Sequence, residues 1–188
     1  MSGDIDLLLA SRSPQRRAIL DQLCIRYAVR PTDAIETNEG PAETVASENA
    51  ARKALAAAAL GVDAPVLGVD TVVSVDGLAY GKPADHREAR EMLTILSGRS
   101  HQVVSALALV RDGEVSNASA VTEVTFRTLD DDQIDWYVGT EEWRERAGGY
   151  AIQARGAALV RAIEGDYLNV VGLPVAALLD LAPGLVGW

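Results

Sequence analysis

One apolar run with a single acid in its middle dominates the first half of the chain: Val66-Leu67-Gly68-Val69-Asp70-Thr71-Val72-Val73-Ser74-Val75-Asp76-Gly77. The apolar residues predict buried strand structure, and Asp76-Gly77 is a typical tight-hairpin pair. Because an ionised carboxylate is costly to bury without a cation or several donors, Asp70 is a candidate for metal binding or catalysis. The alternative is an aspartate at a strand end that caps a turn.

The residues before this run predict a strand, a loop and two helices. Residues 5–9 form a short apolar strand. Ser13 and Pro14 then mark a helix start, as the N-cap and the first helical residue. A second helix is expected over residues 43–60, which are rich in alanine, and Gly61 is its expected left-handed terminating residue.

The residues after the run predict further helices and a long hairpin. The expected elements are a helix over 85–98, strands over 101–110 and 115–127, a helix over 130–138, a strand over 157–163 and a helix over 174–181. Helices separate some of these strands, whereas tight hairpins join others. We therefore expect an α/β fold with a mixed, elongated central sheet, helices on both faces, and two lobes around a cleft.

Composition and charge narrow the class of protein. A chain of 188 residues with 48% hydrophobic side chains is expected to form one domain over residues 1–188. The net charge of −10 argues against binding a nucleic acid polymer. No run approaches the roughly 20 apolar residues of a membrane span. A single cysteine, Cys24, and no recognisable secretory leader predict a cytoplasmic protein without membrane association.

The loop before the first helix is a candidate anion-binding site. Ser11 lies where the strand ends, and the N-terminal backbone N–H groups of the helix attract anions. Arg16 adds fork-shaped donors that suit phosphate oxygens. The alternative is a surface helix whose arginines are merely solvated.

Three loop residues are further candidates, each with a plain alternative. Lys82 lies in Gly81-Lys82-Pro83 and is a candidate phosphate ligand, although a lone loop lysine is more often exposed. Glu36 is a candidate metal ligand, although most loop acids are solvated. Gln153 follows a Gly-Gly turn and carries an amide that can read a base edge, although an exposed glutamine is the simpler interpretation.

The histidines and large aromatic residues give no sign of chemistry. His86 and His101 lack metal-ligand spacing to each other and to Cys24, so a zinc site is not expected. Trp136, Tyr137 and Trp143 are expected to pack in the core or at an interface.

Taken together, the motifs resemble the Maf family of nucleotide pyrophosphatases, which is related in fold to the inosine triphosphatase superfamily. The resemblance runs nearly end to end. It rests on residues 9–17 (LASxSPxRR), 68–73 (GxDTVV), 81–83 (GKP), 89–103 (AxxMLxxLSGRxHxV), 147–153 (AGxYxIQ) and 169–174 (NVVGLP). Several specific motifs in one order are far stronger than any one of them.

The resemblance implies metal-assisted hydrolysis of a nucleoside triphosphate to a monophosphate and pyrophosphate, with Mg²⁺ or Mn²⁺. It implies that Asp70 is the base or a metal ligand that positions water, and that Glu36 is a metal ligand. The phosphates are expected to contact Ser11, Arg16, Lys53 and Lys82. A homodimer is implied by the family only.

The resemblance also bears on the substrate. Thr71 and Gln153 are similar to residues of the members that act on dTTP and UTP, so pyrimidine triphosphates or modified pyrimidine nucleotides are favoured. Gln15 replaces the arginine usual in that group, which removes a charge near the specificity region. Two alternatives remain open: a nucleotide-binding regulatory protein, related to cell division or septum formation, with little turnover, and an enzyme of nucleotide-sugar or sugar-phosphate chemistry.

Overall fold

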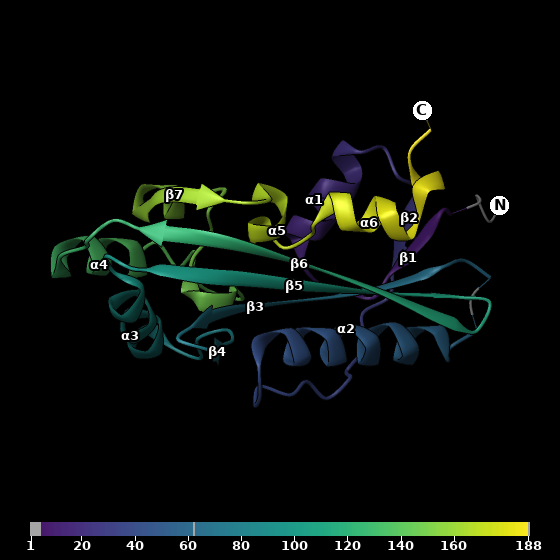
Figure 1. Ribbon diagram of the computed structural model, residues 1–188, viewed down its shortest axis with the longest axis horizontal. Coiled ribbons are helices and arrows are strands. Elements are labelled where there is room, and N and C mark those ends of the chain that lie inside the picture. Colours follow the sequence, from purple (N-terminus) through teal and green to yellow (C-terminus); the bar gives the residue numbers. More distant parts are fainter. Residues whose placement is uncertain (1–4, 62, 188) are drawn as a thin grey trace.

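The computed structural model describes residues 5–61 and 63–187, so the outermost ends of the expected domain lie outside the described residues. Within this part, seven strands form one sheet in the order β2-β1-β3-β5-β6-β7, and β4 pairs separately with β3. The strands are β1 (Leu7–Leu9), β2 (Tyr27–Val29), β3 (Val66–Val75), β4 (Leu78–Tyr80), β5 (Ser100–Arg111), β6 (Glu114–Phe126) and β7 (Val160–Glu164). The long strands β3, β5 and β6 run the length of the molecule (Figure 1).

The sheet is mixed, as expected. β1 pairs in parallel with β2 and β3, whereas the other neighbouring strands pair antiparallel. Helices cover both faces: α2 (Ala42–Ala58) lies on one face, and α1 (Pro14–Gln22), α5 (Tyr167–Val171) and α6 (Val175–Leu181) lie on the other (Figure 1). This arrangement confirms the predicted α/β fold class.

Strand β3 has different neighbours along its outer edge. β1 pairs with Val66 and Leu67, and β4 pairs with residues 73–75. Among the described residues, 68–72 therefore have no strand partner on this edge, although β5 pairs with residues 66–74 of β3 on the other edge. This stretch, which we call the open edge, contains Asp70 and Thr71 and separates the β1–β2 end of the sheet from the β4 end.

Alternation along β3 sends its side chains to opposite faces of the sheet. Val66 and Val72 pack with the alanines of α2, whereas Leu67 and Val69 pack with the α1 side. Gly68 lies on the α2 face, where an added Cβ would be 2.1 Å from Ala50 O. The missing side chain thus lets α2 lie directly on the strand.

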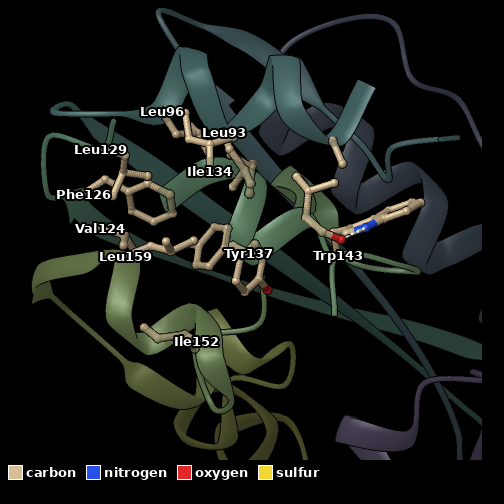
Figure 2. Close-up of a cluster of buried hydrophobic side chains, with 14 of the residues drawn as sticks. Leu93, Leu96, Val124, Phe126, Leu129, Ile134, Tyr137, Trp143, Ile152 and Leu159 are labelled. Carbon is tan, nitrogen blue, oxygen red and sulfur yellow. Dashed lines mark hydrogen bonds between the residues drawn. The ribbon is translucent and has the colours of Figure 1, made fainter. Parts of the chain in front are cut away.

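A third core fills the end of the molecule around α3 (His86–Leu96) and α4 (Asp131–Val138). Figure 2 shows Leu93 and Leu96 of α3 facing Phe126, Leu129 and Ile134, with Tyr137 at the centre. Trp143 is buried and donates its indole N–H to Val138 O at 3.0 Å. Tyr137 and Trp143 are therefore core residues, as expected, whereas Trp136 is 51% exposed.

Local signals in the sequence mark the ends of several elements. Ser13 caps α1, Asp85 caps α3, and Asp130 forms a capping box with Gln133 at α4. The turns at 76–77 and 112–113 have the positive φ values of tight hairpins. None of the helices in the described part of the chain combines the length and apolar character that crossing a membrane requires.

One predicted element begins later than expected, and two short elements were not predicted. The strand expected over 157–163 begins only at Val160, because residues 155–159 form a 3-10 helix in which Gly156 lies against the backbone of Ala151. β2 and α5 were not predicted, since three and five residues are too few to show a clear periodicity.

Candidate functional site

The open edge of β3 forms the floor of a pocket of about 340 Å³. The pocket lies where β1 ends and α1 begins, so the cleft predicted between the two lobes is present. Its lining includes eight predicted site residues: Ser11, Gln15, Arg16, Glu36, Lys53, Asp70, Thr71 and Lys82. Gln153 is exposed and is not among the lining residues. The complete lining brings residues from seven segments of the chain together in one place.

The start of α1 builds the first wall of the pocket. Ser13 Oγ accepts a hydrogen bond from the backbone N–H of Arg16 at 3.4 Å, which caps the helix. Ser13 Oγ also donates to Gln15 Oε1 at 3.1 Å. Ser11 Oγ accepts from the N–H of Ser13 and from Arg16 Nη1, at 3.2 and 2.8 Å. The hydroxyl hydrogen of Ser11 remains available to donate to a ligand.

Arg16 is held in place by three oxygens rather than by a carboxylate. Its Nε donates to Gly172 O at 2.9 Å and its Nη2 to Thr71 Oγ1 at 3.2 Å, in addition to the bond with Ser11. Burial lowers the pKa of Arg16, and the charges of Asp70 and Glu36 oppose that effect. A guanidinium nevertheless stays charged in proteins. The pocket therefore contains a fixed cation whose charge no direct ion pair neutralises among the described residues.

Thr71 serves to position Arg16. Its hydroxyl accepts from Arg16 and lies 2.9 Å from Ser105 Oγ, and Ser105 Oγ donates to Asn169 O at 3.3 Å. Asn169 is fully buried and bonds Val103 O and Thr122 Oγ1. A polar network thus connects the Arg16 side of the pocket to the middle of the sheet.

The acids lie on the α2 side of β3, with Asp70 on the strand itself and Glu36 on the loop before α2. Asp70 is only 7% exposed and accepts from Lys53 Nζ at 2.6 Å and from Asn49 Nδ2 at 3.1 Å. Both partners come from α2, four residues apart, so they lie on one face of that helix. Lys53 Nζ also lies 3.0 Å from Glu36 Oε1. One ammonium group thus joins the two predicted metal-binding carboxylates.

Asn49 fixes the loop that carries Glu36. Its Nδ2 donates to Thr37 O and its Oδ1 accepts from the N–H of Thr37, both at 2.9 Å. Asn49 is fully buried. Asn49 therefore sets the position of the Glu36 loop relative to Asp70 together with Lys53, which pairs with Glu36, and Arg52, whose Nη1 donates to Ile35 O at 3.3 Å.

The donor set suits a hard divalent cation. Glu36 and Asp70 offer carboxylate oxygens, which Mg²⁺ and Mn²⁺ prefer. In the described part of the chain, no group of three or more His, Cys, Asp and Glu side chains is arranged to hold a metal. Two carboxylates without further protein ligands match Mg²⁺, which commonly takes its remaining ligands from water and substrate phosphates.

The segment around residue 145 builds a further wall of the pocket, which we call the far wall. Lys82 Nζ pairs with Glu145 Oε2 at 2.7 Å, and this ion pair lowers the pKa of Glu145. Arg146 also lines the pocket. Burial lowers the pKa of Arg146.

Sequence reasoning missed Asn49, Arg146 and the Ser105–Asn169 network. Asn49 left one signal, because asparagine is unfavourable inside a helix and this one precedes Lys53 by a helical turn. Asn169 and Gly172 stood in a motif without an assigned role. Arg146 had no local signal, since an arginine before a Gly-Gly turn is commonly exposed.

The fold and the pocket define the class: an α/β protein in which an acid on the central sheet, a second acid on a loop and an anion-binding helix start meet in one cleft. The chain belongs to the Maf-like protein family, whose sequence pattern matches residues 6–184.

Curated relatives resemble nearly the whole chain. A dTTP/UTP pyrophosphatase of Pyrococcus furiosus is 42% identical over 178 residues, which is 93% of each chain. A dTTP/UTP pyrophosphatase of Symbiobacterium thermophilum is 49% identical over 172 residues, covering 90% of this chain and 88% of the relative. One of Bacillus velezensis is 44% identical over 173 residues, covering 90% and 91%.

Proposed function

We propose that this protein hydrolyses nucleoside triphosphates, with dTTP, UTP or modified pyrimidine nucleotides as substrates, to the monophosphate and pyrophosphate. The observation that carries the proposal is the Asp70–Lys53–Glu36 group in the same pocket as Arg16 and Lys82. This arrangement offers an acid to position water and cations to receive phosphates. The names of the relatives from Pyrococcus furiosus and Symbiobacterium thermophilum support the substrate class.

Asp70 is the proposed base. Its carboxylate accepts a proton from a water molecule, whose oxygen forms a bond to the α-phosphorus while the bond from that phosphorus to the bridging oxygen of the β-phosphate breaks. Lys53 and Asn49 hold both carboxylate oxygens of Asp70, which fixes the direction from which water is activated. The pyrophosphate leaves with the electron pair of the broken bond.

The cations of the pocket offset the charge that develops on the leaving group. Arg16 is rigid because three oxygens hold it, so it loses little further freedom when it donates to a phosphate. Ser11 adds a hydroxyl donor and Lys82 a mobile point charge on the far wall. Fixed donors aimed at developing charge are the largest source of catalysis in reactions of this type.

Glu36 and Asp70 are the proposed ligands of the divalent cation, Mg²⁺ or Mn²⁺. When bound, such a cation polarises the phosphate oxygens and neutralises part of their charge. Lys53 already faces both carboxylates and neutralises part of their charge in the protein alone. Because the Lys53 ammonium lies beside both acids, it is also placed to contact a phosphate of a substrate that binds next to Glu36 and Asp70.

Substrate choice is proposed to involve Gln15, Thr71 and Gln153. Gln15 lines the pocket and is tied to Ser13, whereas Thr71 acts through Arg16. Gln153 lies on the exposed segment after Ile152, so it is proposed to reach a base only at the outer end of the substrate. Gln15→Arg tests this region, because it restores a charge beside the phosphates.

The decisive experiment identifies the first product. With Mg²⁺ or Mn²⁺, dTTP and UTP are expected to give pyrophosphate, and Asp70→Asn is expected to lose nearly all activity while Arg144→Gln, an exposed control, keeps it. Orthophosphate as the first product would reject the proposal. Nucleotide binding without turnover across ordinary and modified triphosphates would favour the regulatory alternative instead.

The proposal extends to assembly and compartment. We propose a single domain over residues 1–188 that is located in the cytoplasm and acts as a homodimer, and the family resemblance supports only the dimer. The single cysteine supports a reducing compartment. Light scattering of the purified chain measures the oligomeric state.

A further inference from the structure

Arg146 stands out among the cations of the pocket because its charge lacks a partner. It lines the pocket, and its Nη1 donates only to the carbonyl oxygen of Glu145 at 3.2 Å. Its Nε is buried and has no hydrogen-bond partner. Within the described residues, Arg146 takes part in no ion pair.

The other cations around the pocket are satisfied by oxygens. Lys53 joins Glu36 and Asp70, Lys82 pairs with Glu145, and Arg12 pairs with Asp33 at 2.7 Å. Arg16 has its three carbonyl and hydroxyl acceptors. Arg146 is half-buried with one carbonyl acceptor, no carboxylate partner within the described residues and an unpaired Nε, which costs free energy unless an anion binds there.

Glu145 holds a position that an anion of the substrate would take. Its side chain is 78% exposed, and its carboxylate is attracted by Lys82 first and also by Arg146 and Arg12. An exposed carboxylate is easily displaced, because an exposed ion pair contributes little stability. In the protein alone, Glu145 therefore acts as an internal substitute for a ligand anion between Lys82 and Arg146.

We propose that Arg146, together with Lys82, binds the pyrophosphate portion of the substrate, and that this portion displaces the Glu145 carboxylate. This inference rests on the proposed function and gives the Lys82 and Arg146 side of the same pocket the role of binding pyrophosphate. A guanidinium suits paired phosphate oxygens, and two cations from different segments that line one pocket suit two linked phosphates. Arg16 and Ser11 on the first wall then contact the same triphosphate from the α1 side.

The test separates the two parts of the substrate by product inhibition. The probes are inorganic pyrophosphate and UMP, each titrated against UTP hydrolysis by the parent, Arg146→Gln, Arg146→Lys and Glu145→Gln. Arg146→Gln is expected to weaken inhibition by pyrophosphate about 10- to 100-fold, the range of a charge-assisted hydrogen bond, and to leave UMP inhibition unchanged. Arg146→Lys is expected to retain part of the pyrophosphate affinity.

Glu145→Gln tests whether the Glu145 carboxylate competes with pyrophosphate for Lys82 and Arg146. Removing the Glu145 carboxylate frees Lys82 from its ion pair. Pyrophosphate is therefore expected to inhibit this variant more strongly than it inhibits the parent. Arg144→Gln is the matched control, because Arg144 is exposed, stacks on Trp143 and pairs with Glu141 outside the pocket. This control is expected to match the parent in both inhibition constants.

Three outcomes would overturn the inference. Unchanged pyrophosphate affinity in Arg146→Gln would do so, as would a selective loss of UMP affinity, which would place Arg146 beside the nucleoside. Equal losses for both probes in Arg146→Gln and Arg146→Lys would show a merely structural role. Calorimetric titration with pyrophosphate keeps the test independent of turnover: a parent that binds pyrophosphate but hydrolyses no nucleotide would reject the proposed function and leave the Arg146 site intact.

Discussion

Gly68→Ala is expected to push α2 away from β3 and so to lower both the stability of the protein and the rate of hydrolysis. The new Cβ would lie 2.1 Å from Ala50 O, 2.8 Å from Ala54 N and 3.0 Å from Ala54 Cβ. Two of these three atoms belong to the backbone of α2, so no side-chain rotation relieves the contact. Because real Cβ contacts stay above 3.0 Å, the helix has to move away from the strand by about 1 Å.

The cost is expected in both stability and rate. Overpacking of this kind costs about 1–3 kcal/mol, and each kcal/mol lowers the melting temperature by about 2–4 °C in a chain of this size. The same shift carries Lys53 and Asn49 away from Asp70, whose bonds to them are 2.6 and 3.1 Å long. A displacement of about 1 Å in a reactive group costs up to about 100-fold in rate.

Thermal unfolding and pyrophosphate release at saturating UTP measure the two effects. Gly184→Ala is the matched control, because nothing lies within 4 Å of its added Cβ. A Gly68→Ala variant with the melting temperature of the parent would refute the packing argument. A variant that is less stable but equally fast would refute the claim that the spacing of α2 from β3 sets the position of Lys53.

Three further predictions test the core and the second layer of the site. Burial lowers the pKa of His101 to about 4, below the value near 6.5 of the unfolded chain, so stability is full above pH 6.5 and falls by about 3 kcal/mol toward pH 4. His101→Gln is expected to flatten that slope in denaturant titrations at several pH values. Tyr137→Phe leaves the buried N–H of Ala151 without its 2.9 Å acceptor and is expected to lower the unfolding free energy by about 1–3 kcal/mol, measured in urea. Asn49→Leu frees one oxygen of Asp70 and the Glu36 loop, and is expected to weaken Mn²⁺ binding about 10- to 100-fold by calorimetry, whereas an unchanged affinity would contradict its positioning role.

The parts of the fold that the sequence predicts well are those fixed by neighbouring residues. Ser13 before Pro14 starts α1, and Asp130 with Gln133 starts α4. The Asp76-Gly77 turn joins β3 to β4. Each of these features depends on hydrogen bonds within four residues, so the printed sequence contains all the information needed.

The parts that it predicts poorly depend on distant contacts. The open edge of β3 exists because β1 stops at Leu9, beside Leu67, and β4 stops at Tyr80, beside Val73, and no local pattern sets either length. Arg146 is half-buried only because its segment folds over the pocket. Gln153, in contrast, has the local signal of a binding residue but lies exposed in the turn before the 3-10 helix of residues 155–159.

The open edge explains how one pocket serves two faces of a sheet. Asp70 and Thr71 are consecutive, so alternation directs the acid toward α2 and the hydroxyl toward α1. If a strand covered the outer edge of β3 here, the two side chains would lie in separate compartments. Because residues 68–72 have no such neighbour among the described residues, a triphosphate that reaches around the edge of the strand can contact the Asp70 group on one side and Arg16 on the other. The division between water activation and phosphate binding thus follows from where two short strands end.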